Sequence, residues 1–259
     1  MLERRLLDHD VAVLVAPRLE SEGFLIAFSE RGGGVSGPPF RGLNLGLKSG
    51  DDPERVRENR RRLISALGVP AFACPRQVHS TNVFRVGPES AGRGFADPSE
   101  GIPATDALVT TSPDVPIAVL SADCVPLALV DSATGAIAVV HAGWRGVAAG
   151  MVQAAIGEFP DPDRVEAVVG PAIGPDHYEV GDDVASAVGA GSEGGAITHR
   201  AGSRLLLDLP GTVARSLRNL GVSHVAEARE CTACQPERFF SHRRDGSTGR
   251  QGLVAVRRS

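Results

Sequence analysis

The sequence predicts a mixed α+β fold in a single domain spanning residues 1–259. Short apolar runs bounded by turn residues, which are typical of buried strands, recur along the whole chain. Amphipathic helical segments are fewer and are mixed with the strands instead of following them. No change in composition marks a domain boundary, and the hydrophobic (42%) and charged (22%) fractions are those of an ordinary globular protein.

The first half of the chain alternates predicted strands with loops. A helix is expected to begin at Asp52, whose side chain can cap it, with Pro53 in the first turn, and to end at Gly68. Its arginine-rich run, residues 57–62, is expected to be a solvated face. Residues 90–105 are rich in Gly and Pro and predict an exposed loop. The strands expected in this half are 11–16, 24–29, 77–86 and 106–111.

The second half begins with apolar runs at 116–121, 126–130 and 136–140, which predict buried strands. The segment 131–135 is a turn that joins the last two. Residues 189–204 are Gly-rich and are expected to be weakly ordered. Further helices are expected at 147–159, 181–189 and 210–220, and further strands at 164–169, 205–207, 222–228 and 252–257.

Charge and cysteine content bear on the environment of the protein. The formal charge of −4 does not favour nucleic-acid binding. The first residues are too charged for a signal peptide, and no apolar run is long enough to span a bilayer, so we expect a cytoplasmic protein without membrane contact. The cysteines are therefore expected to be reduced. The low aromatic content, 4%, favours a monomer.

A thiol and an imidazole lie at the ends of neighbouring predicted strands. Cys124 begins one strand and His141 ends the next, so antiparallel pairing would bring both to one edge of a sheet. His79 flanks another predicted strand. Two imidazoles and a thiolate are suitable zinc ligands, and three protein ligands leave a position for water or substrate. The first alternative is a metal-free pair, with Cys124 as nucleophile and His141 as base. The second alternative is that both side chains only pack in the structure and have no catalytic role.

Anion binding has its own candidates. Guanidinium groups bind phosphate in a bidentate manner, and Arg145, close to His141 and to a predicted helix start, is the best of them. Trp144 is expected to pack in the core. Cys231 and Cys234 form a lone Cys-x-x-Cys pair, which is a weak zinc signal, and we expect two loop cysteines there. The other candidate anion ligands are Arg243, Arg244 and Arg250.

Several segments together resemble the YfiH family, long labelled laccase-domain or multicopper polyphenol oxidase proteins. They occur in family order over nearly the whole chain. The N-terminal segments are Phe28-Ser29-Glu30-Arg31-Gly32-Gly33, Leu43-Asn44-Leu45-Gly46, Gln77-Val78-His79-Ser80 and Thr105-Asp106-Ala107-Leu108. The central ones are Ala122-Asp123-Cys124-Val125-Pro126, His141-Ala142-Gly143-Trp144-Arg145-Gly146 and Gly170-Pro171-Ala172-Ile173-Gly174. The C-terminal ones are Cys231-Thr232, Phe240-Ser241-His242-Arg243-Arg244 and Thr248-Gly249-Arg250.

The resemblance implies α-β-β-α layers, related to cysteine deamidases of the cytotoxic-necrotising-factor type. It implies zinc on His79, Cys124 and His141. It also implies a purine nucleoside phosphorylase for adenosine, inosine and methylthioadenosine, with adenosine deaminase activity at the same site. Some members are instead described as editing peptidoglycan precursors, which would suit a cysteine or zinc amidase.

The resemblance also leads to expected roles for further residues. Arg145 would hold phosphate with Arg31 or Arg244, Asn44 would contact the substrate, and Asp123 would act as acid/base or orient a ligand. His242, Glu30 and Cys234 depart from the family pattern, which bears on substrate preference. A copper polyphenol oxidase is the remaining alternative; sulfur also accepts Cu(I), but the paired His-x-His patterns of multicopper centres are missing from the sequence.

Overall fold

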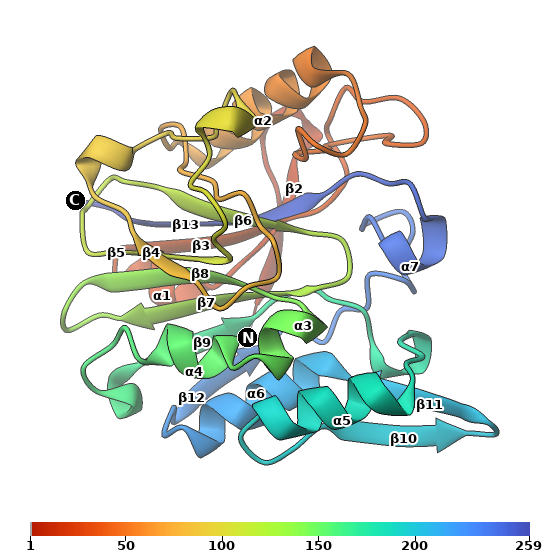
Figure 1. The fold of residues 1–259 in the computed structure, drawn as a ribbon. Helices are drawn as coiled ribbons and strands as arrows, with labels where there is room; N and C mark the ends of the chain where they lie inside the picture. Colours follow the sequence, from red (N-terminus) through yellow and green to blue (C-terminus); the bar gives the residue numbers. More distant parts are fainter. Residues whose placement is uncertain (1) are drawn as a thin grey trace.

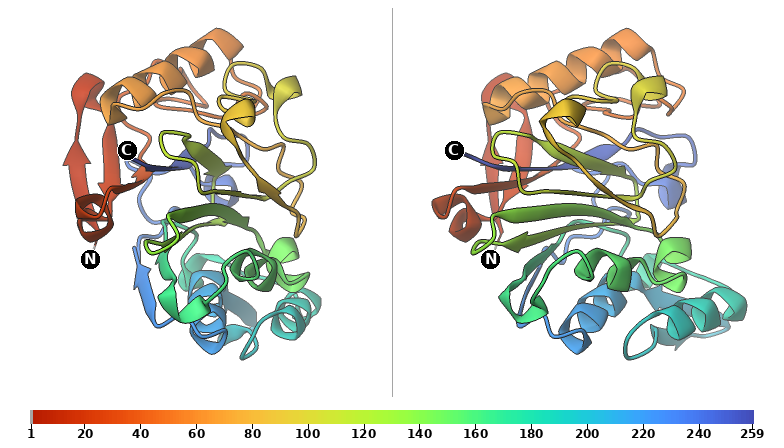
Figure 2. Two further views of the ribbon diagram at one scale, coloured as in Figure 1. Left: turned by 90° about the vertical axis from the view of Figure 1, so that its left-hand side faces the viewer. Right: turned by 60° about the vertical axis from the view of Figure 1, so that its left-hand side comes forward.

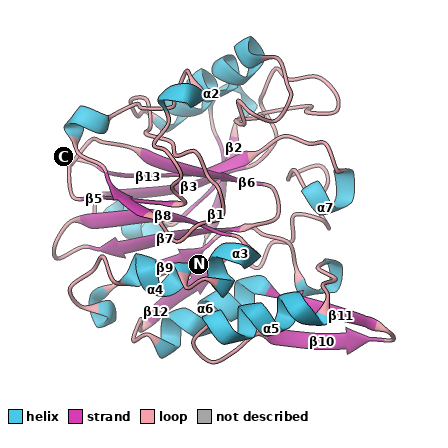
Figure 3. Ribbon diagram, viewed as in Figure 1, coloured by secondary structure: helices cyan, strands magenta, loops and turns pink. Residues whose placement is uncertain are grey.

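The computed structural model describes residues 2–259, which form two β-sheets stacked face to face with helices on both outer faces (Figures 1 and 2). Figure 3 shows the same layers coloured by secondary structure, with helices above and below a double layer of strands. The mixed fold and the α-β-β-α order expected from the sequence are thereby confirmed. The relation to cysteine deamidases and the limits of the domain stay predictions.

The first sheet joins the two ends of the chain. Strand β13 (Gln251–Arg257) lies between β3 (Phe24–Ser29) and β6 (Ile117–Ser121) and pairs with both in antiparallel fashion. The strands β2 (Ala12–Val15) and β1 (Glu3–Leu6) extend the sheet beyond β3. This arrangement places the C-terminal strand in the interior of a sheet otherwise built from the first half of the chain.

The second sheet contains the strand pair expected to carry the thiol and the imidazole. Strands β7 (Val125–Asp131) and β8 (Ala136–Ala142) pair antiparallel, with Pro126 opposite His141. The end of β8 and the residue before β7 therefore lie at the same edge, as the sequence predicts. The sheet order is β12-β9-β7-β8-β5-β4, with β12 (His224–Glu227), β9 (Glu166–Val169), β5 (Ala107–Thr110) and β4 (Val83–Arg85).

The helices are divided between the two outer faces. Helix α2 (Pro53–Leu67) covers the first sheet. The second sheet is covered by α3 (Trp144–Ala148), α4 (Met151–Ile156), α5 (Asp182–Gly191) and α6 (Leu209–Asn219). The remaining elements are α1 (Pro17–Ser21), α7 (His242–Asp245), the hairpin β10 (Ile197–Ala201) and β11 (Arg204–Asp208), and 3-10 turns at Asp8–Asp10, Pro88–Ser90, Pro98–Glu100, Pro162–Arg164 and Pro175–His177.

Strand β7 shows how the sequence builds these layers. All its residues are buried, and successive side chains point to opposite faces of the sheet. Leu127 and Leu129 pack against the helices of the second sheet, whereas Ala128 and Val130 pack between the two sheets. An uninterrupted apolar run is therefore what a strand covered on both faces requires.

Most of the predicted elements are confirmed, including the helix start, where the Asp52 side chain accepts a hydrogen bond from Glu54 N. The single helix expected at 147–159 is wrong, because Gly150, with φ of 94°, divides it into α3 and α4. The strand expected at 77–86 is reduced to β4. The stretch 189–204, expected to be weakly ordered, contains most of the β10–β11 hairpin.

The prediction that the arginine run of α2 is solvated is wrong for Arg60. Its guanidinium is buried and donates to the carbonyl oxygens of Leu45 (2.8 Å), Gly94 (2.7 Å) and Phe95 (2.7 Å). These carbonyls belong to loops and need partners that no strand provides. Arg60 therefore anchors two loops to the helix. Among residues 2–259, no helix is both long enough and apolar enough to cross a bilayer.

Candidate metal and active site

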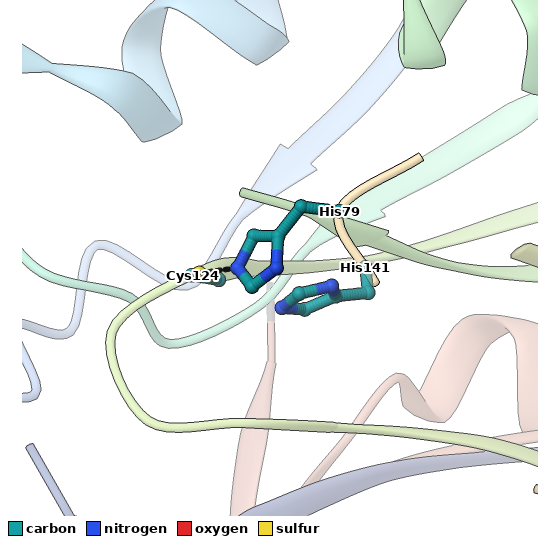
Figure 4. A group of neighbouring side chains, drawn as sticks. All are labelled: His79, Cys124 and His141. Atoms are coloured by element: carbon teal, nitrogen blue, oxygen red, sulfur yellow. Dashed lines mark hydrogen bonds between the residues drawn. The ribbon is translucent and has the colours of Figure 1, made fainter. Parts of the chain in front are cut away.

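Three segments converge at one edge of the second sheet (Figure 4). His79 comes from the loop before β4, Cys124 immediately precedes β7, and His141 lies near the end of β8. Their ligand atoms lie within 4.8 Å of one another. The Cys124 Sγ is 3.8 Å from His79 Nε2, and the two imidazole rings meet edge to face with centroids 4.8 Å apart. The structure thus brings together the three residues that the sequence singled out as metal ligands.

The buried carboxylate of Asp106 holds the imidazole of His141 and the backbone of the His79 loop. Its Oδ1 accepts from His141 Nδ1 (2.9 Å) and from the backbone amide of His79 (2.9 Å). Its Oδ2 accepts from the amides of Val78 (3.1 Å) and Ser80 (2.7 Å) and from the Ser80 hydroxyl (2.9 Å). Because Nδ1 of His141 is held by Asp106, Nε2 is left to face the cluster. The sequence analysis gave Asp106 no role.

The backbone around the cluster is tightly constrained. His79 and Asp123 have φ of 61° and 97°, in the left-handed region that non-glycine residues rarely adopt. Such strain persists only where surrounding contacts enforce it, and it is concentrated at functional sites. Gly143 allows the close approach of the chain after β8, because a Cβ there would lie 2.6 Å from His79 Cδ2 and 3.0 Å from Cys124 Sγ.

The cluster also shifts the ionisation of its members. Burial alone would raise the pKa of the Cys124 thiol, but the imidazoles of His141 and His79 lower that pKa to about 6. Burial would lower the pKa of His141, but Cys124 and Asp106 raise it to about 9. In the metal-free protein, a thiolate beside an imidazolium is therefore the favoured state around neutral pH.

The donor set fits a zinc ion. A tetrahedral site with Zn–S of about 2.3 Å and Zn–N of about 2.05 Å places S and N about 3.6 Å apart. The 3.8 Å between Cys124 Sγ and His79 Nε2 is close to this separation. A thiolate and two imidazoles are common zinc ligands, and the carboxylate behind His141 is the partner that metal-bound histidines usually have. Three protein ligands leave one coordination position open.

The cluster lies in a cavity of about 560 Å³, a volume typical of small-molecule sites. Its walls carry an excess of positive charge. Asp123 is the one carboxylate among the lining residues that the structure describes. Aromatic surface comes from Trp144 and Tyr178, both half-buried. The cationic lining residues are Lys48, Arg60, Arg76, Arg145, Arg243 and Arg250.

Of the predicted catalytic residues, Arg145 and Asp123 both line this cavity. The guanidinium of Arg145 is exposed and lies 4.4 Å from the centroid of the Trp144 ring. Trp144 is therefore not fully in the core, contrary to the sequence expectation. The Asp123 carboxylate accepts hydrogen bonds from Thr232 Oγ1 (2.6 Å) and from the amide of Arg243 (2.6 Å).

The residues expected to contact substrate lie outside the lining of this cavity. Arg31 donates to the carbonyl oxygens of Pro236 (2.7 Å) and Arg41, and Arg244 donates to that of Thr232 (2.8 Å). Asn44 is buried, and its Oδ1 accepts from the amide of Arg250 (2.9 Å). All three side chains are hydrogen-bonded to the backbone of loops, and their roles in substrate binding stay predictions.

Sequence reasoning missed two further lining residues. Gln77 bonds both backbone groups of Leu120, accepting from its amide (2.9 Å) and donating to its carbonyl (2.7 Å), and so fixes the loop that carries His79. Tyr178 lies under the Arg243 guanidinium, 5.1 Å from the ring centroid. Burial first, then the charges of Cys124 and Asp123, raise the pKa of Tyr178, so its hydroxyl remains a hydrogen-bond donor. The Gln77-Val78-His79 motif was the one signal available for Gln77.

Comparison with known proteins shows the family of the chain. The family model described as multi-copper polyphenol oxidoreductase laccase matches residues 25–258. The purine nucleoside phosphorylase YfiH of Shigella flexneri is 38% identical over 234 residues, covering 88% of this chain and 92% of that protein. A purine nucleoside phosphorylase of Deinococcus radiodurans is 41% identical over 235 residues, covering 88% and 87%.

Solved structures share the fold. The crystal structure of YlmD from Geobacillus stearothermophilus matches with a TM-score of 0.90 and 34% identity over 95% of this chain and 96% of that one. The crystal structure of the Bacillus licheniformis protein YfiH matches with a TM-score of 0.86 and 29% identity over 94% and 96%. The layered architecture is therefore common to these proteins.

Proposed function

We propose that this chain, which belongs to the YfiH family of laccase-domain proteins, is a zinc-dependent purine nucleoside phosphorylase. Its substrates would be adenosine, inosine and methylthioadenosine, and it would deaminate adenosine at the same site. The observation that carries the proposal is the cluster of His79, Cys124 and His141 inside a cavity whose walls are rich in guanidinium groups. The names of the curated relatives support the same class of reaction.

Phosphate binding is assigned to Arg145, because its guanidinium is free to meet an anion. Within residues 2–259, no hydrogen bond from this guanidinium to the protein is present, whereas Arg243 and Arg250 each use one nitrogen on backbone carbonyls. Stacking on Trp144 orients the planar fork without occupying its N–H groups. Arg243 and Arg250 would add positive charge and further donors on the same walls.

A zinc ion held by His79, Cys124 and His141 would supply Lewis-acid chemistry and lower the pKa of a bound water toward neutrality. The protein contributes the fixed positions of the groups around it. Asp123 is assigned an orienting role instead of proton transfer, since both of its oxygens already accept hydrogen bonds. Arg31 and Arg244 would support the phosphate site through the loops that they hold.

The test is a phosphate-dependence assay with adenosine, inosine and methylthioadenosine that measures ribose 1-phosphate (or its methylthio analogue), free base and ammonia separately. Release of base that requires phosphate is expected with all three, and ammonia with adenosine. Arg145→Met should raise the KM for phosphate about 10- to 100-fold, since a charge-assisted contact contributes about 1.5–3 kcal/mol. Arg164→Met, which removes an exposed arginine outside the cavity lining, is the matched control. Base release at an equal rate without phosphate would refute phosphorolysis.

A second function is favoured by the contact of Cys124 with the two imidazoles, which lowers the pKa of the thiol and gives a nucleophilic thiolate beside an imidazolium that has taken its proton. A cysteine amidase acting on a peptidoglycan precursor would use this pair without metal. Activity that survives chelation but is lost on alkylation of Cys124 would support this function and contradict the zinc mechanism. Metal analysis of protein purified without added copper, together with a phenol oxidation assay, tests the copper oxidase alternative.

A further inference from the structure

A second group of metal-ligating side chains lies outside the cavity lining. His177, in the 3-10 turn Pro175–His177, faces Cys231 and Cys234 in the loop after β12. The His177 Nδ1 is 3.9 Å from Cys231 Sγ and 3.5 Å from Cys234 Sγ, and the three ligand atoms lie within 4.8 Å of one another. The sequence analysis expected two loop cysteines here and did not connect them with His177.

The two sulfur–nitrogen separations are close to those of a tetrahedral zinc site. From Zn–S of about 2.3 Å and Zn–N of about 2.05 Å, the S···N separation is about 3.6 Å and the S···S separation about 3.8 Å. Cys234 and His177 already match the first value, and Cys231 needs to move by a few tenths of an ångström. Two thiolates and an imidazole are also a common donor set for zinc.

The backbone holds the two segments in place. The loop and the turn are joined by hydrogen bonds from Thr232 N to the Ala172 carbonyl (3.0 Å) and from Ala172 N to the Glu230 carbonyl (3.2 Å). The amide of Gly174 donates to Cys231 Sγ (3.2 Å), as amides do to the thiolates of structural zinc sites. A Cβ on Gly174 would lie 3.1 Å from that sulfur, so glycine permits the approach.

We propose that His177, Cys231 and Cys234 bind a second zinc ion, which acts as a structural clip. His177 and Cys234 are exposed, so the fourth position is open to water. The clip would join the turn that leads into Tyr178 to the loop that carries Thr232, whose hydroxyl holds Asp123. The second ion would therefore stabilise one wall of the cavity without entering it. The proposal does not depend on the reaction catalysed in the cavity.

The experiment is a zinc count by mass spectrometry on reduced protein loaded with zinc and freed of excess metal. We expect about two zinc ions per chain for the unmodified protein and about one for Cys234→Ser. Cys124→Ser should also retain about one, and the double variant none. His224→Ala, which removes an exposed histidine of β12, should retain two and serves as the control.

Cobalt substitution locates the ions independently of the count. In Cys124→Ser, a sulfur-to-cobalt charge-transfer band should remain, and Cys234→Ser added to that variant should abolish it. A zinc content in Cys234→Ser equal to that of the unmodified protein would overturn the proposal. So would a single ion in the unmodified protein that Cys124→Ser removes, or a disulfide between Cys231 and Cys234 that persists under the reducing conditions used. Circular dichroism of each variant confirms that a lost ion is not a lost fold.

Discussion

Replacement of Asp106 by Asn should weaken both the folding of the protein and its zinc binding. The wild-type carboxylate is fully buried, and its two oxygens accept five hydrogen bonds from the His79 loop and from His141. Burial alone would raise the pKa of Asp106, but His141 and the amides of Ser80 and Val78 hold it far below its usual value. Asn has the same shape but presents an amide group where one oxygen stood.

The magnitude follows from the hydrogen bonds. Each Asp106 oxygen accepts from at least two donors, so the Asn nitrogen faces at least two N–H or O–H groups whichever way it turns. Each hydrogen bond to a buried charge contributes about 1.5–3 kcal/mol, so the loss is about 3–6 kcal/mol of unfolding free energy. The loss of the partner behind His141 should also weaken zinc binding by about 10- to 100-fold.

The assay combines urea unfolding of the metal-free protein with zinc competition against a fluorescent chelator. Asp131→Asn is the matched control, because Asp131 is equally buried and caps the turn at the opposite end of β7. It should lower stability without weakening zinc binding at His79, Cys124 and His141. The reasoning would be refuted if Asp106→Asn bound zinc as tightly as wild type. It would also be refuted if Asp131→Asn lost as much zinc affinity as Asp106→Asn.

The Asp106 contacts also predict a pH dependence. Because the folded pKa of this carboxyl is depressed, its stabilising contribution is present above the unfolded pKa of about 3.9 and is lost as the pH falls toward the folded value. The difference in unfolding free energy between wild type and Asp106→Asn should therefore shrink as the pH falls below about 4. A difference that stays constant through that range would contradict the depressed pKa.

Three further predictions concern other parts of the structure. Arg60→Met should lower the unfolding free energy, measured by urea unfolding, by about 2–4 kcal/mol, because three carbonyl oxygens lose their donor. The control Arg61→Met, on the exposed face, should change it by less than about 0.5 kcal/mol. Equal losses in the two variants would contradict the anchoring role of Arg60. Gly143→Ala should displace His79 and Cys124 and abolish zinc binding at that cluster in the chelator competition. Retained zinc affinity would contradict this prediction and show that the loop can move to accommodate the added methyl group. In metal-free protein, the alkylation rate of Cys124, followed by peptide mass spectrometry, should rise through about pH 6, because the lowered pKa leaves the thiolate present above that pH. A midpoint of this rise near pH 9 would contradict the contacts with the imidazoles.

The sequence by itself determined the elements that carry the site. The apolar runs at 126–130 and 136–140 predict two buried strands, and the short turn between them is compatible with the antiparallel pairing that the structure shows. This pairing places Cys124 and His141 at one edge. Both ends of α2 were equally predictable, because Asp52 and Pro53 at its start and Gly68 at its end act through contacts only a few residues apart.

Only the tertiary structure decided which polar side chains meet. Asp106 lies 35 residues from His141, and Thr232 lies 109 residues from Asp123, so no local pattern links either pair. The same is true of Arg60, which is buried because two distant loops present carbonyl oxygens to it, although the next residue, Arg61, is exposed. Periodicity and capping describe interactions within a few residues, whereas the partner of a buried charge is chosen by the packing of whole layers. For that reason the strands were predictable. The contacts of Asp106, the loops held by Arg60 and the cluster of His177, Cys231 and Cys234 were not.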